Sequence, residues 1–368
     1  VVAVTLVAQV DLALAGVDAG ARHVAQCLVQ AGAGLGTGGE RHVQPSSGLL
    51  RQRVEGWLLN RGLSVSLVFG ERSGDHGIVS VRAPLAIVIT AYGENPFLRS
   101  TLSSVMANVP PTTPTLLLDD SSESDFVRMT SRPYGKRVLY RRTERRLGVA
   151  GAFNRALEIS DADYTLILGH DDVVLPGLVP SMIEAILVDD VPGMIQAGIQ
   201  VIDRDGNPSR ELVDMVKRLI APRGDVTLSG QRLVTRLAAG NWMYHPGIAW
   251  RTQLALSERF DESMLVCMDM DLALRLAFAG HSLRVLSEPG VSYRRHPASV
   301  SSALEARTRF DEETRVYRWC SEQARQRGWW PAYLLARTSL TTRINAVLRT
   351  VANRPQATLA RANRGSDQ

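Results

Sequence analysis

The sequence has few cysteines and almost no lysine. Its three cysteines, Cys27, Cys267 and Cys320, lie far apart and match neither a disulfide framework nor the spacing of metal ligands, which favours buried reduced thiols. Lys136 and Lys217 are the only lysines among 42 basic residues, so arginine carries the net charge of +5. Guanidinium groups bind diphosphates and anionic membrane surfaces well. The charge therefore favours a phosphate-bearing ligand and is compatible with peripheral membrane association.

Long hydrophobic runs are also missing. No segment approaches the roughly 20 apolar residues that cross a bilayer, which argues against a transmembrane helix. The apolar residues 1–14 include Asp11 and lack a basic flank, so they do not resemble a signal peptide, and we expect a cytoplasmic protein, at the inner face of the membrane where it associates with one. No basic run contains interleaved aromatic residues, so nucleic acid is not an expected partner.

The pattern of the chain changes twice along its length. Residues 1–83 form a mixed N-terminal extension of unknown role, with a helix expected at 17–30 and a strand at 63–69. Residues 84–302 alternate between apolar strands and amphipathic helices. Residues 303–368 form an arginine-rich helical segment that ends in a polar tail, which we expect to be flexible.

The alternation in residues 84–302 predicts an α/β fold with a mostly parallel sheet flanked by helices. The expected strands cover residues 85–90, 115–118, 137–140, 164–168 and 194–202. The expected helices cover residues 97–106, 150–159, 178–187, 211–219 and 231–239. In such folds the ligand binds at the carboxyl ends of the strands.

Acidic residues follow two of these strands. Asp119 and Asp120 follow one strand, and Asp171 and Asp172 follow another, after Gly169 and His170. Two carboxylates at a strand end can hold magnesium or manganese against a diphosphate. Each pair could equally cap a turn or a helix, and either pair taken alone leaves both interpretations open.

Taken in order, these segments resemble the family 2 glycosyltransferases, which have the GT-A fold. Residues 87–92 resemble the first strand and donor-binding loop of that family, residues 118–122 its second loop, and residues 146–154 the segment beside the donor. The resemblance implies a nucleotide-diphosphate sugar as donor. It also implies donor contacts from Thr90, Ala91, Tyr92, Asp119, Asp120, Gly148, Asn154, His170 and Asp171.

The resemblance extends to the metal site and to the catalytic base. It implies that Asp171, Asp172 and His296, the last within the closing segment 293–301, bind Mg²⁺ or Mn²⁺. Residues 266–276 resemble the acidic segment that opens a helix in the family, which makes Asp269 the general base. The alternative for Asp269 is a helix cap, next to an i,i+4 ion pair between Asp271 and Arg275.

Three positions depart from the family pattern. Arg146 replaces an asparagine, Gly169 stands where the first carboxylate of an Asp-x-Asp motif is usual, and Met268 replaces a glutamate. Trp242 and Trp250 could stack on an acceptor sugar or belong to the core. The sequence does not choose between a phosphate-binding role and a surface role for the two arginines that precede His296.

The function implied by the resemblance is inverting transfer of a sugar from a nucleotide-diphosphate donor to a hydroxyl group. The acceptor class would be a glycan or a lipid-linked molecule in cell-surface polysaccharide or glycan biosynthesis. The departures keep open a non-catalytic domain that binds a sugar nucleotide or a glycan. A nucleotidyltransferase would need a glycine-rich phosphate loop after the first strand, and residues 90–95 do not form one.

Overall fold

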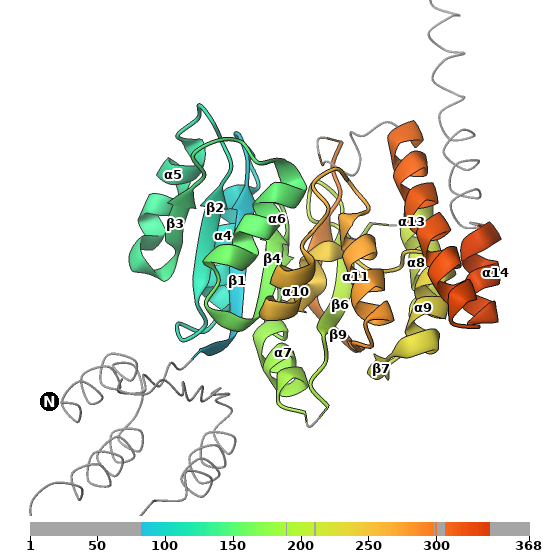
Figure 1. The fold of residues 1–368 in the computed structure, drawn as a ribbon. Coiled ribbons are helices and arrows are strands. Elements are labelled where there is room, and N and C mark those ends of the chain that lie inside the picture. Colours follow the sequence, from blue (N-terminus) through green and yellow to red (C-terminus); the bar gives the residue numbers. More distant parts are fainter. Residues whose placement is uncertain (1–81, 189, 210, 298, 300–305, 339–368) are drawn as a thin grey trace, which may run out of the picture. The chain divides into compact units, whose positions relative to one another are not determined.

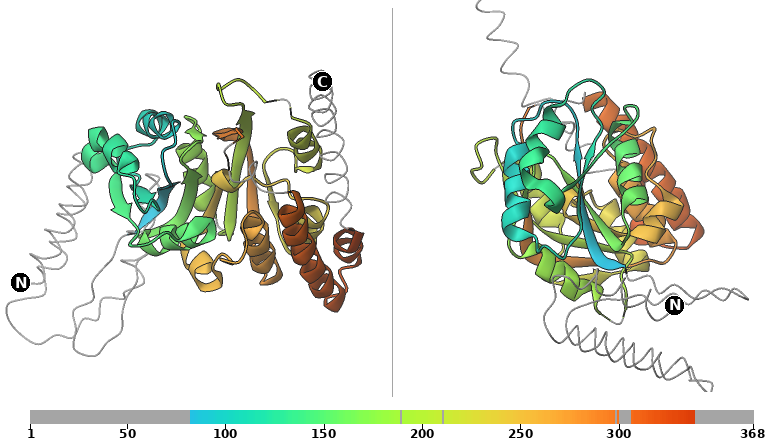
Figure 2. Two further views of the ribbon diagram at one scale, coloured as in Figure 1. Left: turned by 90° about the horizontal axis from the view of Figure 1, so that it is seen from above. Right: turned by 90° about the vertical axis from the view of Figure 1, so that its left-hand side faces the viewer.

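A computed structural model describes residues 82–338, apart from residues 189, 210, 298 and 300–305. The helix expected at 17–30 and the strand expected at 63–69 lie outside this range. The description below concerns the unit that begins at residue 82. Within the described residues, nine strands form one sheet with helices on both faces (Figure 1 and Figure 2).

The first half of the sheet is parallel. Its strands, in spatial order, are β3 (Leu139–Arg142), β2 (Thr115–Asp119), β1 (Ala83–Ala91) and β4 (Ala162–Gly169). Every pair of neighbours among them runs in the same direction. Leu85 to Ile89 of β1 are buried, as expected for a central strand covered by helices on both faces. All four strands therefore end at the same edge of the sheet.

The second half of the sheet is mixed. It contains β5 (Val173–Val174), β6 (Met194–Ile202), β7 (Val226–Leu228), β8 (Ile248–Arg251) and β9 (Leu283–Arg294). Strand β8 runs antiparallel to both β4 and β6, whereas β9 is parallel to β6 and antiparallel to β5 and β7. The α/β fold with a helix-flanked sheet is confirmed, and the antiparallel pairs belong to this half.

The helices that cover the first half connect its parallel strands. They are α4 (Leu98–Asn108), α5 (Phe126–Ser131), the 3₁₀ helix η1 (Arg132–Arg137) and α6 (Gly148–Ile159). Pro110, Pro111 and Pro114 follow α4, and a proline cannot continue a helix because it lacks the backbone N–H. This composition explains why the chain leaves α4 and enters β2 within a few residues.

Eight further helical segments cover the second half. They are α7 (Leu178–Ile186), α8 (Leu212–Ile220), α9 (Gly230–Ala238), the 3₁₀ helix η2 (His245–Gly247), α10 (Thr252–Glu258), α11 (Met268–Phe278), α13 (Ala306–Gln326) and α14 (Trp330–Thr338). None of the helices in the described part of the chain is both long enough and apolar enough to span a membrane.

Two hydrophobic clusters form the core. The first packs α4 and α7 against the sheet, and the second packs α9, α11, α13 and α14 against it. Val316, Tyr317 and Cys320 of α13 are buried in the second cluster together with Trp250 of β8. Residues 306–338 therefore share a core with the α/β region, across the boundary that the sequence suggested at residue 302.

Candidate active site

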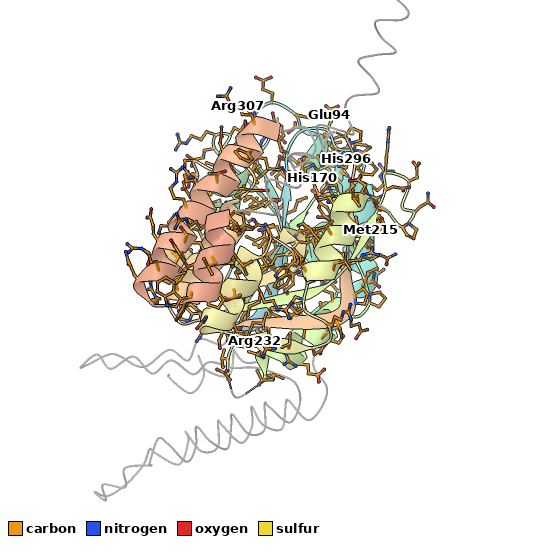
Figure 3. All side chains as sticks on the ribbon, turned by 90° about the vertical axis from the view of Figure 1, so that its right-hand side faces the viewer. Glu94, His170, Met215, Arg232, His296 and Arg307 are labelled. Atoms are coloured by element: carbon orange, nitrogen blue, oxygen red, sulfur yellow. The ribbon has the colours of Figure 1, made fainter. Side chains whose placement is uncertain are left out.

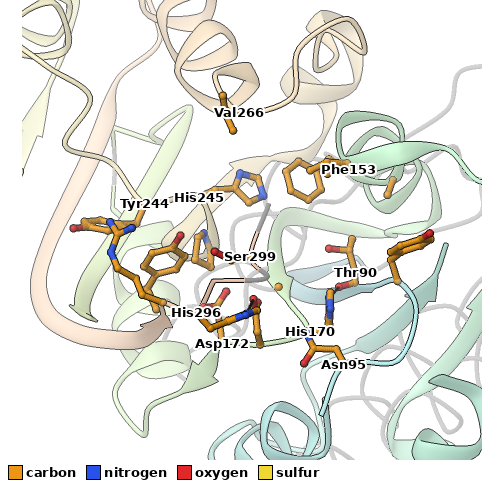
Figure 4. A pocket seen from close by; sticks show the side chains of 18 of the residues that line it. Thr90, Asn95, Phe153, His170, Asp172, Tyr244, His245, Val266, His296 and Ser299 are labelled. Atoms are coloured by element: carbon orange, nitrogen blue, oxygen red, sulfur yellow. Dashed lines mark hydrogen bonds and ion pairs between the residues drawn. The ribbon is translucent and has the colours of Figure 1, made fainter. Parts of the chain in front are cut away.

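A pocket of about 690 Å³ opens where β1, β2 and β4 end. Its walls contain Asp120 after β2, Asp171 after β4 and Asp269 on α11. Figure 4 shows Thr90, His170, Asp172 and His296 in this pocket, with Val266 across from them in that view. The pocket walls include most of the residues singled out in the sequence, namely Thr90, Ala91, Tyr92, Asp120, Gly148, His170, Asp171, Asp172, Asp269 and His296.

Two of the residues singled out do not reach this pocket. Asp119 is fully buried, where its carboxylate accepts hydrogen bonds from the Ser121 N–H at 2.9 Å and the Tyr140 hydroxyl at 2.6 Å. The amide of Asn154 bonds the backbone N–H and carbonyl of Phe260 at 2.8 and 3.0 Å. Both side chains hold loops together, and neither Asp119 nor Asn154, from which donor contacts were expected, is among the residues that line the pocket.

Asp120 both caps a helix start and lines the pocket, so it fits both the capping and the ligand-binding interpretation of the sequence. Its Oδ1 accepts from the N–H of Leu147 at 2.8 Å, and its Oδ2 accepts from the N–H of Gly148 at 3.0 Å. The carboxylate thus satisfies free donors at the start of α6, where an acidic side chain is favourable. Gly148 has φ of +74°, a conformation that favours glycine. Asp120 nevertheless lines the pocket beside this helix start.

Side chains from three loops meet at the β1 and β4 end of the pocket. The Arg146 guanidinium carbon lies 4.1 Å from the centre of the Tyr92 ring, close enough for a cation–π contact. His170 Nδ1 lies 3.1 Å from the carbonyl oxygen of Thr90, an acceptor, which assigns the proton to Nδ1. Arg146, the departure from the usual asparagine, is therefore part of the pocket wall.

The three residues expected to bind a metal lie together. His296 Nε2 lies 2.8 Å from Asp171 Oδ2, and Asp172 Oδ1 accepts from the N–H of Arg294 at 3.0 Å. Burial raises the pKa of Asp172 well above its usual range, and the charge of Asp171 raises it further. A Cβ atom at Gly169 would lie 2.7 Å from Asp171 Oδ1 and 2.8 Å from Asp172 Oδ2. The two carboxylates therefore converge on the space above Gly169.

The chemistry of this group fits a divalent cation. Two carboxylates supply the hard oxygen ligands that Mg²⁺ and Mn²⁺ prefer, and imidazole is an accepted ligand of Mn²⁺ and related ions. A bound cation would also offset the repulsion between the two carboxylates. As they stand, the described residues include no group of three or more His, Cys, Asp or Glu side chains arranged as metal ligands.

Asp269 lies in the first turn of α11. It is only 8% exposed, and its Oδ1 accepts from the N–H of Met270 at 2.7 Å. Burial raises the pKa of Asp269, whereas the positive charge of Lys217 lowers it. Asp271 forms the ion pair with Arg275 expected from their spacing, at 2.9 Å. Asp269 therefore lines the pocket, whereas Asp271 has a partner in Arg275.

Two basic residues, Lys217 and Arg295, line the pocket together with Asp269. Lys217 lines the pocket, its Nζ donates to the Met243 carbonyl at 2.7 Å, and burial lowers its pKa to about 8. Arg295 also lines the pocket and binds both carboxylate oxygens of Asp214 at 2.7 Å. The only earlier signal for Lys217 was its rarity in the composition.

Other assignments follow from burial. Arg294 is buried and donates to the Asp171 carbonyl at 2.9 Å, so it supports the loop and does not belong to the pocket walls. Trp242 and Trp250 belong to the hydrophobic core, which favours a core role over stacking on an acceptor sugar.

His245, in contrast, lines the pocket, where its ring stacks on Phe153 with ring centres 4.0 Å apart. Burial lowers the pKa of His245 to about 3, so its ring is neutral.

Comparison with known proteins agrees with this geometry. Residues 86–252 match the family model described as glycosyl transferase family 2. Among solved structures, S. aureus TarS 1–349 in complex with UDP-GlcNAc superimposes with a TM-score of 0.50 and 14% identity, over 63% of this chain and 65% of that chain. The chain thus spans less than two thirds of that TarS chain. No curated protein sequence matches significantly.

Two further structures show similar arrangements. S. aureus TarS 1–349 without a named ligand gives a TM-score of 0.50 at 14% identity, over 69% of this chain and 72% of that one. The mannosyltransferase PcManGT from Pyrobaculum calidifontis, in complex with GDP-Man and Mn²⁺, gives 0.48 at 14% identity, over 86% and 88% of the two chains.

The parallel half-sheet, with the acidic pocket at its edge, is similar in fold to the TarS complex with UDP-GlcNAc. The family match is narrower: residues 86–252, less than half of this chain, resemble glycosyl transferase family 2.

Proposed function

We propose that the chain is an inverting, metal-dependent glycosyltransferase that moves a sugar from a nucleotide-diphosphate donor to a hydroxyl acceptor. One observation carries the proposal: Asp120, Asp171 and Asp269, which are far apart in sequence, line a single pocket at the carboxyl ends of parallel strands. The match of residues 86–252 to the family 2 model and the fold shared with the UDP-GlcNAc complex of TarS support a nucleotide sugar as donor.

The nucleotide would bind at the β1 and β2 end of the pocket. Thr90, Ala91 and Tyr92 provide backbone and ring surface there, and Asp120 lies beside the start of α6. Because the Asp120 carboxylate already occupies the start of α6, the positive charge for the donor on this side comes from Arg146, next to Tyr92. The proposed donor contacts therefore keep Thr90, Ala91, Tyr92, Asp120, Gly148, His170 and Asp171.

Asp171, Asp172 and His296 would hold the cation. When bound, Mg²⁺ or Mn²⁺ supplies positive charge that stabilises the departing diphosphate. The convergence of both carboxylates above Gly169, with His296 at 2.8 Å from Asp171, supports this set. On this proposal Gly169 does not remove a needed ligand, because Asp172 supplies the second carboxylate.

Asp269 is the proposed general base. Its carboxylate would accept the proton of the acceptor hydroxyl as the hydroxyl oxygen bonds to the anomeric carbon. The bond from that carbon to the phosphate oxygen breaks, and its electron pair leaves with the nucleoside diphosphate. Lys217 favours the ionised form of Asp269 against the effect of burial, which supports a base at this position.

We propose that the acceptor is a glycan or lipid-linked molecule of cell-surface polysaccharide or glycan synthesis. The transfer would take place at the inner face of a membrane. The arginine-rich composition supports an anionic surface as partner. A non-catalytic sugar-nucleotide-binding domain remains the alternative, and turnover separates the two.

The test uses the full chain with Mn²⁺ and a panel of nucleotide sugars that includes UDP-GlcNAc. A bound donor should raise the melting temperature, and the same donor should release nucleoside diphosphate. Asp269→Asn should keep that melting shift and lower turnover roughly 100-fold or more, because the base is lost. Asp271→Asn is the matched control, since Asp271 pairs with Arg275 outside the pocket. Donor binding without any turnover of the wild type would favour the binding domain.

A further inference from the structure

Helix α13 contacts the segment that leads into α11. Arg309, Glu312 and Arg315 are spaced three residues apart on α13, so they lie near one side of the helix. Arg315 Nη2 donates to Asp261 Oδ2 at 3.0 Å and to Ser263 Oγ at 3.1 Å. Arg309 lines the pocket at the other end of this row. The row therefore follows the chain from residue 261 to the pocket.

Glu312 makes the central contact of the row. Its Oε1 accepts from the N–H of Leu265 at 2.7 Å, and its Oε2 accepts from the N–H groups of Val266 and Cys267, each at 3.0 Å. Three successive N–H groups directed at one carboxylate form an anion-binding nest of the kind found at helix starts. The side chain is only 8% exposed, so these bonds are shielded from water.

The segment held by Glu312 leads directly into Asp269. Leu265, Val266 and Met268 line the pocket together with Asp269, whereas Glu312 does not belong to the described pocket walls. Cys267 immediately precedes α11, and Asp269 is the second residue of that helix. The direction of the Asp269 side chain is therefore set by a helix start that a residue from α13 fixes in place.

We propose that Glu312 is a positioning residue that fixes the start of α11 and thereby directs Asp269 into the pocket. The inference rests on the proposed function, because it takes Asp269 as the base. It makes α13, which lies outside the segment that matches the family model, a part of the catalytic unit. Glu312 acts through the backbone of residues 265–267 and does not contact the substrate.

The test compares Glu312→Ala and Glu312→Gln with the control Glu322→Ala in the full chain. Glu322 is an exposed residue of the same helix. Amide hydrogen exchange should become faster at residues 265–267 in Glu312→Ala and stay unchanged in the control. With UDP-GlcNAc as the probe donor, UDP release should fall roughly 10- to 100-fold while the donor-induced melting shift persists, because small displacements of a catalytic group are costly.

Restoring activity with a small carboxylate distinguishes the proposed anion contact of Glu312 from a general packing role. The alanine variant leaves three N–H groups without their carboxylate, so added acetate or formate should restore part of the UDP release, and chloride at equal ionic strength should not. Glu312→Gln retains the side-chain volume and one oxygen, and it should show an intermediate loss. If the alanine variant fails to fold, the same exchange and turnover measurements on the glutamine variant test the positioning role.

Unchanged exchange at residues 265–267, or unchanged turnover, would overturn the positioning role. An equal loss of donor binding and turnover would also overturn it, since that pattern indicates general disruption. Failure of the proposed function looks different. In that case the wild type releases no nucleoside diphosphate with any donor of the panel, or Asp269→Asn retains full turnover, while hydrogen exchange still reports whether Glu312 holds the helix start.

Discussion

Gly169 departs from the family pattern, and two carboxylates converge on the space above it. A side chain at this position would meet the carboxylates of Asp171 and Asp172 at less than 3 Å. Asp172 is buried, and the Arg294 N–H fixes one of its oxygens. The glycine therefore leaves room for a different pair of carboxylates, which follows it in the sequence.

The metal proposal gives a prediction at the residue scale. Asp171→Ala should remove the dependence of turnover on Mn²⁺, because it deletes the carboxylate that contacts His296. It should also abolish the rise in melting temperature that Mn²⁺ causes in the wild type. Asp161→Ala is the control, since Asp161 lies before β4, at the opposite end of the strand, and pairs with Arg82. A Mn²⁺ titration identical to that of the wild type would remove Asp171 from the site.

Helix α8 has an unusual distribution of polar and apolar side chains between its inward and outward faces. Its inward side is polar, with Asp214 buried and Lys217 at the pocket. Its outward side is apolar, with Leu212, Met215 and Leu219 exposed by 52%, 53% and 74%. Figure 3 shows Met215 at the outer side of this helix. Soluble helices normally present the opposite arrangement.

The apolar face of α8 supports the proposed association with a membrane surface. Exposed Arg218 lies on the same helix, next to Leu219, and basic residues beside an apolar stripe suit an anionic lipid surface. A helix of nine residues would lie on the surface, because it is too short to cross a bilayer. The pocket residue Lys217 would then lie on the side away from the lipid.

Leu219→Glu should weaken the binding of the full chain to vesicles that contain anionic phospholipid, by roughly tenfold, because it removes apolar area and adds a repelled charge. Co-sedimentation with the vesicles measures the effect. The control is Leu334→Glu, since Leu334 of α14 is 57% exposed on a different helix. Equal losses in both variants, or no vesicle binding by the wild type, would contradict a specific role for α8.

At the scale of the whole molecule, the C-terminal helices share a hydrophobic core with the helices beside the pocket. Tyr317 and Cys320 of α13 and Ala332 of α14 are buried in the cluster that also contains residues of α9 and α11. Glu312 holds the start of α11 from the same helix. The unit that positions Asp269 therefore extends beyond residue 302.

Shortened chains test whether the folded unit extends beyond residue 302. A chain of residues 82–338 should unfold cooperatively and bind UDP-GlcNAc as the full chain does, whereas residues 82–302 should lose cooperative unfolding. The shorter chain exposes the apolar surface that α13 and α14 cover, and a domain has only about 5–15 kcal/mol of stability to lose. Thermal melting followed by circular dichroism measures the difference. Equal melting curves for the two chains would contradict a shared core.

The expected strands and helices of residues 84–239 occur close to their predicted bounds, because each follows a local periodicity. The strand at 194–202 has those bounds in the structure, and the helix expected at 150–159 begins two residues earlier. Strands β5, β7, β8 and β9 were not predicted. Their short or irregular patterns become strands through pairing with neighbours, which no local signal encodes.

The sequence by itself determined the alternating α/β pattern, the acidic residues at the strand ends and their resemblance to family 2, since these depend on the order of residues along the chain. Only the tertiary structure decided which of those residues share a pocket. It separated Asp120 from Asp119, joined Asp171 to His296, and brought Glu312 to the start of α11. These contacts join residues far apart in sequence, so they depend on how the sheet and helices pack together.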